Sequence, residues 1–227
     1  MRLALGTAQF GQAYGIANQE GQVSFNEINS IISFCKNIGI NTIDTAINYG
    51  NSEKLLGEIG VDDFKVITKI PSIPDSCPNV RSWLSDQIEL SLNRLNLSSL
   101  YGIMLHKPEQ LFGPQGAELL QSLIEQKELG KVKKLGVSIY DPCELKSILS
   151  MHHFGIIQCP FNLVDRRLVT TGWLDKLKKE DIEIHTRSSF LQGLLTMPRG
   201  DLPEKFNKWE DLWDQWHDWL NANSFSA

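Results

Sequence analysis

The chain has 227 residues, of which 41% are hydrophobic and 22% are charged, as in an ordinary globular protein. Its formal net charge of −5 gives no indication of a nucleic acid or an anionic membrane as a partner. No apolar run approaches the roughly 20 residues of a membrane span, and the first residues lack the pattern of a signal peptide. The four cysteines are scattered without a CxxC pair, which is typical of reduced thiols in a cytoplasmic protein.

Short runs rich in β-branched residues alternate along the chain with longer stretches of helical periodicity. The predicted strands are residues 2–7, 40–45, 64–69, 100–105, 132–138, 155–160 and 182–187. Ser24 and Glu27 form the pattern of a capping box before one helix, residues 78–96 predict a second, and Asp141 with Pro142 predicts the start of a third. Strict alternation of strand and helix predicts parallel strands joined by right-handed crossovers.

The spacing of the predicted units favours a (β/α)8 barrel of the TIM type, built as a single domain over residues 1–227. A doubly wound open sheet is the alternative, but its GxGxxG signature is absent after the first strand, where the chain reads GTAQFGQAYG. Because the strand count stops at seven, we expect the barrel to lack its last β/α unit. The chain is then either a fragment or an open barrel.

The last segment, residues 203–227, predicts a helix with tryptophans at near-helical spacing. These are Trp209, Trp213, Trp216 and Trp219. We expect the stripe to pack into the core. In an open barrel it could instead form an exposed patch or a contact for self-association.

Four titratable side chains lie at or just beyond the ends of successive predicted strands. Asp44 lies near the end of the second strand and Tyr49 follows five residues later, whereas Lys69 ends the third strand and His106 follows the fourth. In a parallel barrel the C-terminal ends of the strands form one face, so these side chains could converge on one site. Taken singly, each could be a cap, a packing residue or a solvated strand end.

Together, the four side chains could protonate a carbonyl oxygen. A tyrosine has a reference pKa of about 10, and an ammonium about 4 Å away would stabilise the tyrosinate by roughly 4 kcal/mol at an effective dielectric near 20. A carboxylate would hold the ammonium in place, and a histidine would orient the carbonyl. No side chain supplies a hydride, so this hypothesis requires a nicotinamide cofactor.

Several collinear motifs resemble the aldo/keto reductase family over essentially the whole chain. GINTIDTAINYGNSEKLLGE resembles the family signature, and VITKIP and GIMLHKPE resemble the segments that carry its lysine and histidine. GTAQFG, KKLGVSIY, IIQCPFNLVDRR and HTRSSFLQGLL match further segments in the same order. The resemblance implies that Tyr49 is the general acid, that Lys69 lowers its pKa, that Asp44 holds Lys69 and that His106 positions the carbonyl.

The resemblance also implies a cofactor site and a reaction. The residues that it places around the cofactor are Gly6, Thr7, Ser138, Gln158, Arg187, Ser188, Phe190 and Gln192. Among these, Ser138 and Gln158 would hydrogen-bond the nicotinamide carboxamide. The implied reaction is reduction of a small aldehyde, ketone or sugar carbonyl with NADPH as the hydride donor, and NAD is possible as the cofactor. No metal is expected.

Three departures from the family pattern bear on the cofactor and substrate. Ile139 stands where an asparagine usually follows the serine, and Arg187 stands where many members stack a tyrosine on the nicotinamide ring, a role that a planar guanidinium can also fill. The segment that grips the 2′-phosphate lies in the eighth unit, so the choice between NADP and NAD stays open. Ala8 stands where some members place a tryptophan, which indicates a roomier pocket.

Two other functions remain open from the residues alone. A shortened barrel could bind a nucleotide or a partner without turnover. Alternatively, Lys69 could act as a Schiff-base nucleophile in a lyase.

Overall fold

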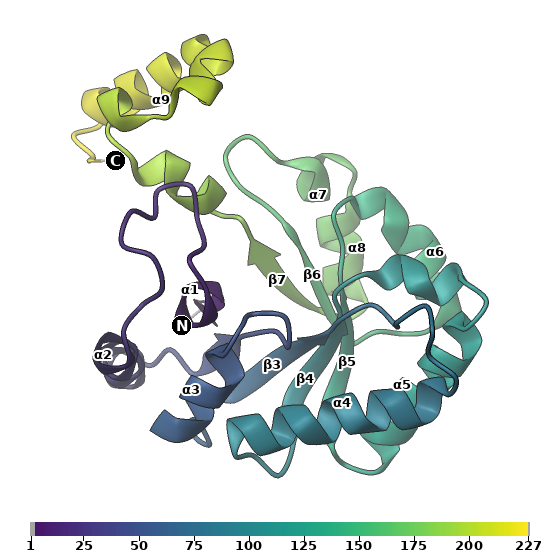
Figure 1. Cartoon of the computed structure of the whole chain (residues 1–227). Coiled ribbons are helices and arrows are strands. Elements are labelled where there is room, and N and C mark those ends of the chain that lie inside the picture. Colours follow the sequence, from purple (N-terminus) through teal and green to yellow (C-terminus); the bar gives the residue numbers. More distant parts are fainter. Residues whose placement is uncertain (1–2, 227) are drawn as a thin grey trace.

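The computed structural model describes residues 3–226 and contains one sheet of seven parallel strands, in the order β1 to β7 along the chain (Figure 1). The strands are β1 (Leu5–Gly6), β2 (Thr42–Asp44), β3 (Lys65–Ile70), β4 (Leu100–Leu105), β5 (Val132–Ser138), β6 (Ile156–Pro160) and β7 (Glu183–Arg187). Each strand pairs with the next one in the sequence. The sheet curls into an open barrel, which matches the predicted (β/α)8 fold without its last unit.

Helices lie in the connections between the strands, and most of them cover the outside of the sheet; the last helix of the chain follows β7 and lies away from the barrel (Figure 1). They are α1 (Ala8–Gly11), α2 (Phe25–Asn37), α3 (Ser52–Ile59), α4 (Val80–Leu95), α5 (Gly116–Glu128), α6 (Leu145–Met151), α7 (Arg167–Thr170), α8 (Trp173–Lys179) and α9 (Glu210–Ala222). Short 3₁₀ segments occur at η1 (Pro108–Phe112), η2 (Pro142–Glu144), η3 (Leu191–Thr196), η4 (Arg199–Asp201) and η5 (Glu204–Trp209).

The predicted helix starts are present in the structure. Ser24 caps α2 by accepting a hydrogen bond from the backbone N–H of Glu27. Asp141 and Glu144 form a complete capping box at η2, which leads directly into α6. These caps satisfy backbone N–H groups that the first helical turn leaves without partners.

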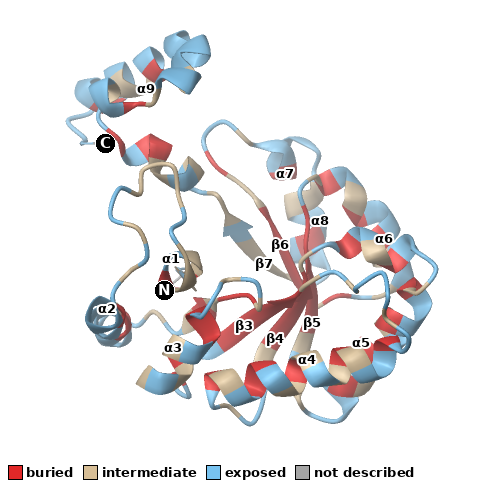
Figure 2. Cartoon of the chain, in the orientation of Figure 1, coloured by how far each residue is buried: buried red, intermediate tan, exposed pale blue. Residues whose placement is uncertain are grey.

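The main hydrophobic core lies between the sheet and the surrounding helices, where β3 to β6 are buried along most of their length and β7 is only partly buried (Figure 2). Inside the barrel, Ile67, Met104 and Ile156 form a smaller cluster against Tyr101. Next to it, the Tyr101 hydroxyl and the Lys134 ammonium each donate to the Glu183 carboxylate at 2.8 Å. The interior is therefore filled by side chains, and the open end of the barrel at the strands' C-termini is left for a site.

The first two predicted strands are longer than those in the structure. Of the strand predicted over residues 2–7, residue 2 lies outside the described residues, and the prediction was too long for the rest, because β1 comprises only Leu5 and Gly6. The predicted 40–45 strand is reduced to β2. Among the described residues β1 pairs with β2 alone. A strand paired on one side has fewer ladder hydrogen bonds to hold its ends extended, which accounts for its shortness.

The predicted helix over residues 203–227 begins later than expected. Its α-helical part is α9, and η5 precedes it; residue 227 lies outside the described residues. Trp213 is 3% exposed and packs in a separate cluster with leucines of η3, whereas Trp209 and Trp219 are 45% and 50% exposed. Core packing was therefore predicted correctly for Trp213 and wrongly for Trp209 and Trp219, because α9 packs away from the barrel core.

None of the helices between residues 3 and 226 combines the length and the apolar character needed to cross a bilayer.

Candidate active site

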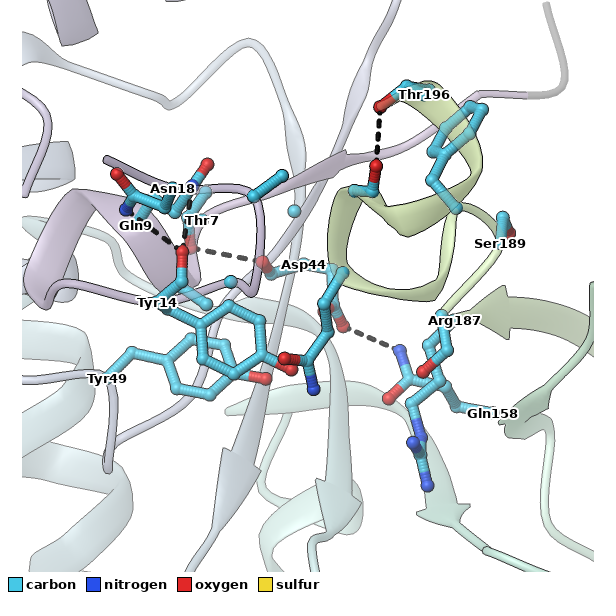
Figure 3. Close-up of a pocket in the computed structure, with 18 of the residues that line it drawn as sticks. Thr7, Gln9, Tyr14, Asn18, Asp44, Tyr49, Gln158, Arg187, Ser189 and Thr196 are labelled. Atoms are coloured by element: carbon cyan, nitrogen blue, oxygen red, sulfur yellow. Dashed lines mark hydrogen bonds between the residues drawn. The ribbon is translucent and has the colours of Figure 1, made fainter. Parts of the chain in front are cut away.

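A cavity of about 660 Å³ lies at the C-terminal ends of the strands (Figure 3). Its lining comes from the ends of β1, β2 and β7, from Gln158 on β6, and from the loops after β1, β2, β4, β5 and β7. The lining residues that the sequence had singled out are Gly6, Thr7, Ala8, Asp44, Tyr49, His106, Gln158, Arg187, Ser188, Phe190 and Gln192. Residues as far apart in the sequence as Gly6 and Thr196 thus share one cavity, as expected for strand ends in a parallel barrel.

Lys69 and Asp44 form a buried ion pair beneath the cavity. Lys69 is 1% exposed, and its Nζ donates to Asp44 Oδ1 and Oδ2 at 2.8 and 2.9 Å and to the Thr45 carbonyl oxygen at 2.9 Å. The same Nζ lies 5.1 Å from the centre of the Tyr49 ring. Adjacent strands β2 and β3 therefore bring the carboxylate, the ammonium and the phenol together.

Three buried hydroxyl groups hold the backbone around this pair. Ser52 Oγ donates to Thr7 Oγ1 at 3.0 Å and lies 3.2 Å from Thr45 Oγ1, and Thr7 Oγ1 donates to the Asp44 carbonyl oxygen at 3.0 Å. All three hydroxyl-bearing residues are 0% exposed. The cluster joins the ends of β1 and β2 to the start of α3, so it fixes the backbone that carries Asp44.

The loop that carries Tyr49 packs tightly against α1. A Cβ atom at Gly11 would overlap the backbone of Tyr49, and Gly50 has a φ of +53° in close approach to Gly11. Glycine suits both positions, because it has no Cβ to collide at Gly11 and adopts the positive φ of Gly50 readily. The close packing fixes where the Tyr49 side chain enters the cavity.

The direction of the Tyr49 pKa shift differs from the prediction. Burial and the Asp44 carboxylate raise the pKa of Tyr49 well above its usual value, although the charge of Arg187 opposes them. The contribution of Lys69 to this pKa stays a prediction, and the net direction of the shift is opposite to the lowering that was predicted. The reason is that the Asp44 carboxylate pairs with the Lys69 ammonium and offsets its charge, while burial lowers the pKa of Lys69 itself.

His106 is neutral near pH 7. Burial, followed by the charge of Lys69, lowers its pKa to about 4 from an ordinary value of 6.5. Its ring lies edge-on to the Tyr49 ring, with the two centres 6.1 Å apart. A neutral imidazole at this position retains one N–H donor for an oxygen atom in the cavity.

Ser138 and Gln158 lie close together at the ends of β5 and β6. Ser138 Oγ donates to Gln158 Oε1 at 3.0 Å, and Gln158 Nε2 donates to Asp44 Oδ1 at 2.9 Å, as Figure 3 shows for the second contact. Gln158 lines the cavity, whereas Ser138 is 2% exposed and lies behind it. Their predicted contact with a nicotinamide carboxamide stays a prediction.

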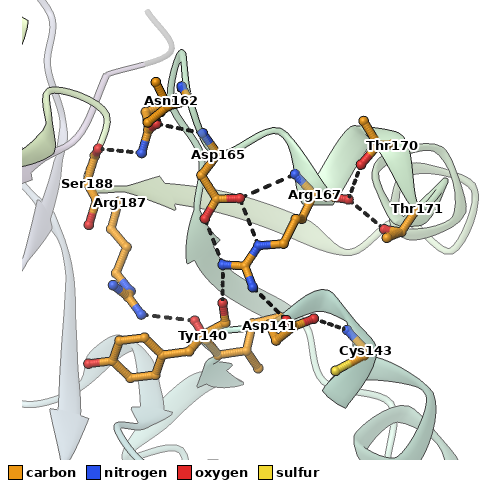
Figure 4. A network of polar contacts seen from close by, with 12 residues as sticks. Tyr140, Asp141, Cys143, Asn162, Asp165, Arg167, Thr170, Thr171, Arg187 and Ser188 are labelled. Atoms are coloured by element: carbon orange, nitrogen blue, oxygen red, sulfur yellow. Dashed lines mark hydrogen bonds and ion pairs between the residues drawn. The ribbon is translucent and has the colours of Figure 1, made fainter. Parts of the chain in front are cut away.

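Arg187, at the end of β7, contacts the loop that follows β5. Its Nη2 donates to the Ile139 carbonyl oxygen at 3.0 Å, and its guanidinium carbon lies 4.2 Å from the centre of the Tyr140 ring (Figure 4). The Ile139 side chain is 0% exposed and belongs to the main core. The residue at the asparagine position therefore faces the core, and its backbone oxygen contributes to the site instead.

The loop after β7 has an unusual backbone. Ser188, Leu191 and Gln192 have φ values of +58°, +49° and +57°, a region that costs energy for residues with a Cβ atom. The Ala17 backbone N–H donates to the Gln192 carbonyl oxygen at 3.1 Å, which joins this loop to the loop after β1. Strained backbone of this kind concentrates at ligand-binding sites.

Sequence reasoning missed several residues of the cavity wall. Tyr14, Gln9 and Asn18 line it, and both amide side chains donate to the Tyr14 carbonyl oxygen, at 2.8 and 3.0 Å. Tyr140 and Ser189 line it as well. Gln9, Tyr140 and Ser189 stood within the matched segments GTAQFG, KKLGVSIY and HTRSSFLQGLL. Tyr14 and Asn18 belong to an irregular loop after α1 that has no periodic signal.

The sequence matches the profile of the aldo/keto reductase family over residues 2–224. An oxidoreductase of Schizosaccharomyces pombe is 31% identical over 124 residues, which cover 50% of this chain and 43% of that protein. The NADH-specific methylglyoxal reductase of Escherichia coli is 27% identical over 180 residues, which cover 70% and 55% respectively. The chain thus spans about half the length of these curated relatives.

A solved structure shares the fold over nearly the whole chain. The glycerol dehydrogenase of Gluconobacter oxydans superposes with a TM-score of 0.71 at 24% identity, covering 98% of this chain and 75% of that one. At this identity the likeness supports the fold alone. The profile match over residues 2–224 shows that the chain belongs to the aldo/keto reductase family.

Proposed function

We propose that the chain reduces an aldehyde, ketone or sugar carbonyl by hydride transfer from NADH or NADPH, with Tyr49 as the general acid. The observation that carries this proposal is the grouping of Asp44, Lys69, Tyr49 and His106 around one cavity, in a chain of this family. A phenol, an ammonium and a neutral imidazole are the groups that protonation of a carbonyl oxygen requires.

The cavity residues fit a nicotinamide cofactor. A volume of about 660 Å³ is in the range of cofactor sites, and a Cβ at Gly6 would meet nothing within 4 Å, so the floor beside β1 is open. Thr7, Gln158 and the loop of Ser188, Phe190 and Gln192 would hold the cofactor, with Arg187 beside the ring and Ser138 behind Gln158. The reduced nicotinamide would supply the hydride. Because the relative from Escherichia coli is NADH-specific, NADH is a candidate as well as NADPH.

Side chains of the protein would donate the proton and stabilise the charges that its transfer creates. The raised pKa keeps Tyr49 protonated near pH 7, so its hydroxyl is available to donate to the carbonyl oxygen as negative charge develops there. The Lys69 ammonium, 5.1 Å from the ring centre, would stabilise the tyrosinate that remains, and Asp44 would keep the ammonium in place. His106 would donate a hydrogen bond to the same oxygen.

The test combines cofactor binding with turnover. The purified chain is titrated with NADH and with NADPH by nicotinamide fluorescence, and carbonyl reduction is then assayed for the unmodified chain and for Tyr49→Phe. We expect binding of at least one cofactor and a turnover that falls at least a hundredfold in Tyr49→Phe with cofactor affinity unchanged. Turnover that persists in Tyr49→Phe would contradict the assignment of the general acid.

A second candidate is nucleotide binding without turnover. It is favoured by one observation: in the described part of the chain, β1 and β7 each pair on one side only, so the barrel is open. Cofactor binding without reduction of any carbonyl in the same assay would support it. The lyase alternative is disfavoured, because Lys69 is 1% exposed and its ammonium donates three hydrogen bonds.

A further inference from the structure

Arg187 brings a positive charge into the cavity that no carboxylate of residues 3–226 neutralises. Its side chain lines the cavity at the end of β7, and its one hydrogen bond within these residues goes to the Ile139 carbonyl oxygen. A guanidinium has five N–H donors, so most of them remain for another partner. Other arginines of the chain pair with acids; Arg167, for example, binds Asp141 and Asp165.

The other ionisable groups of the cavity do not offset this charge. The Asp44 carboxylate accepts two hydrogen bonds from Lys69 and one from Gln158, so its charge is paired with that of Lys69. Tyr49 is protonated and His106 is neutral near pH 7, as their shifted pKa values indicate. The cavity therefore carries one net positive charge, located at Arg187.

The neighbouring loops hold the guanidinium in place. It stacks on the Tyr140 ring at 4.2 Å, and the Tyr140 backbone oxygen in turn accepts a hydrogen bond from Arg167 Nη2 at 3.1 Å. Arg167 itself is clamped by the carboxylates of Asp141 and Asp165 (Figure 4). A cation that is already oriented loses less conformational entropy when it binds an anion than one on a free side chain.

We propose that Arg187 binds a carboxylate of the carbonyl substrate, so that the site prefers oxo acids and acidic sugars to neutral carbonyl compounds. This inference rests on the proposed function of the same cavity. Guanidinium and carboxylate form paired, charge-assisted hydrogen bonds, which are about twice as strong as neutral ones. The phosphates of the cofactor are a second source of negative charge, and the experiment has to separate the two.

The test compares two aldehydes of nearly the same shape. 4-Carboxybenzaldehyde carries a negative charge, whereas 4-carbamoylbenzaldehyde is neutral. With whichever of NADH or NADPH the chain binds, we expect kcat/KM to favour the carboxylate by about tenfold or more, as for a hydrogen bond to a charged group. Arg187→Gln should abolish this preference and Arg187→Lys should keep part of it. Arg81→Gln should keep all of it, because Arg81 pairs with Glu125 on helices outside the cavity.

A binding measurement separates this proposal from the proposed reaction. Calorimetry compares 4-(hydroxymethyl)benzoate with its amide on the unmodified chain and on Arg187→Gln, and thermal unfolding checks that the variant is folded. Preferential binding of the carboxylate that depends on Arg187 supports the proposal even if no turnover is seen.

Two outcomes would overturn the proposal. One is an equal affinity of the unmodified chain for the carboxylate and the amide. The other is an Arg187→Gln variant that binds NADH and NADPH more weakly but keeps the preference for the carboxylate, because the guanidinium would then serve the cofactor phosphates.

Discussion

The two walls of the cavity are built differently. On the wall formed by β1 to β4, Thr7, Ser52 and Lys69 are at most 1% exposed, and each has hydrogen-bond partners inside the protein. On the wall formed by β5 to β7, Tyr140 and Phe190 are 65% and 64% exposed. The loop after β7 on the second wall has positive φ at Ser188, Leu191 and Gln192, whereas the positive φ of Asn96, between β3 and β4, belongs to the C-terminal cap of α4.

This difference indicates that the two walls serve different functions in the proposed reaction. Proton transfer requires groups held in one geometry, which the buried hydroxyl cluster and the ion pair of the first wall supply. Recognition of a cofactor and a substrate requires a surface that adjusts to a ligand, and exposed loops are the part of a protein that rearranges most easily. Substitutions on the first wall should therefore affect turnover and stability, and those on the second should affect affinity.

The largest effect is expected for Lys69→Met. The variant keeps the volume of the side chain but removes the cation that would stabilise the tyrosinate, so turnover should fall by roughly 10²- to 10⁴-fold while cofactor affinity changes little. Steady-state kinetics and cofactor titration measure both. Lys65→Met is the control, because Lys65 lies on the same strand with its Nζ over the Tyr101 ring. Similar turnover in the two variants would contradict a catalytic role for Lys69.

Glu53→Gln should have the next largest effect, on stability. Glu53 is 2% exposed and accepts hydrogen bonds from Thr68, Ser91 and Arg94, which tie α3 to β3 and α4. Removing its charge leaves a partly buried arginine without its partner, which should cost about 2–4 kcal/mol of unfolding free energy in urea titrations.

The matched control for Glu53→Gln is Glu58→Gln on the same helix. Glu58 pairs with Lys54 at 3.8 Å on an exposed face, so its loss should cost less than about 0.5 kcal/mol. Equal losses of unfolding free energy in the two variants would show that the buried hydrogen bonds of Glu53 stabilise the protein no more than the exposed ion pair of Glu58 does.

Gly193→Ala tests the second wall. Gly193 has a φ of +93°, and a Cβ there would overlap Ala17, so alanine should disturb the contact between the two loops. The strain of about 1–2 kcal/mol should weaken NADH or NADPH binding by several-fold while thermal unfolding of the barrel changes little. Gly200→Ala is the control, because no atom lies within 4 Å of the added Cβ. Unchanged cofactor affinity in Gly193→Ala would argue against a binding role for this loop.

The smallest effect concerns pH and His106. Because the folded-state pKa is about 4 and the ordinary value is 6.5, the unfolded chain takes up a proton in this window that the folded chain does not. The contribution of the neutral imidazole to stability is thus fully present above pH 6.5 and decreases as the pH falls towards 4. Melting curves of His106→Gln should lose less stability over this window than those of the unmodified chain. An identical loss would mean that His106 titrates normally.

The sequence predicted the elements and the site residues that local patterns encode. Alternating strand and helix signals indicated a parallel barrel, and polar residues at the strand ends indicated that Asp44, Lys69, Tyr49 and His106 would meet. Both predictions work because hydrophobic periodicity and strand-end position are properties of short segments. In a parallel barrel the strands follow sequence order, so neighbouring units in the chain are neighbours in space.

Only the tertiary structure decided the charges and the cross-strand contacts. The raised pKa of Tyr49 and the lowered pKa of His106 follow from burial, which depends on segments far from either residue. Gln158 donates a hydrogen bond to Asp44, which lies 114 positions earlier in the sequence. The guanidinium of Arg187, at the end of β7, packs on the ring of Tyr140, which follows β5. The shortness of β1 and the exposure of Trp209 in η5 and Trp219 in α9 also depend on what packs against them. Desolvation and long-range pairing are set by what packs against a residue, which no local pattern in the chain encodes.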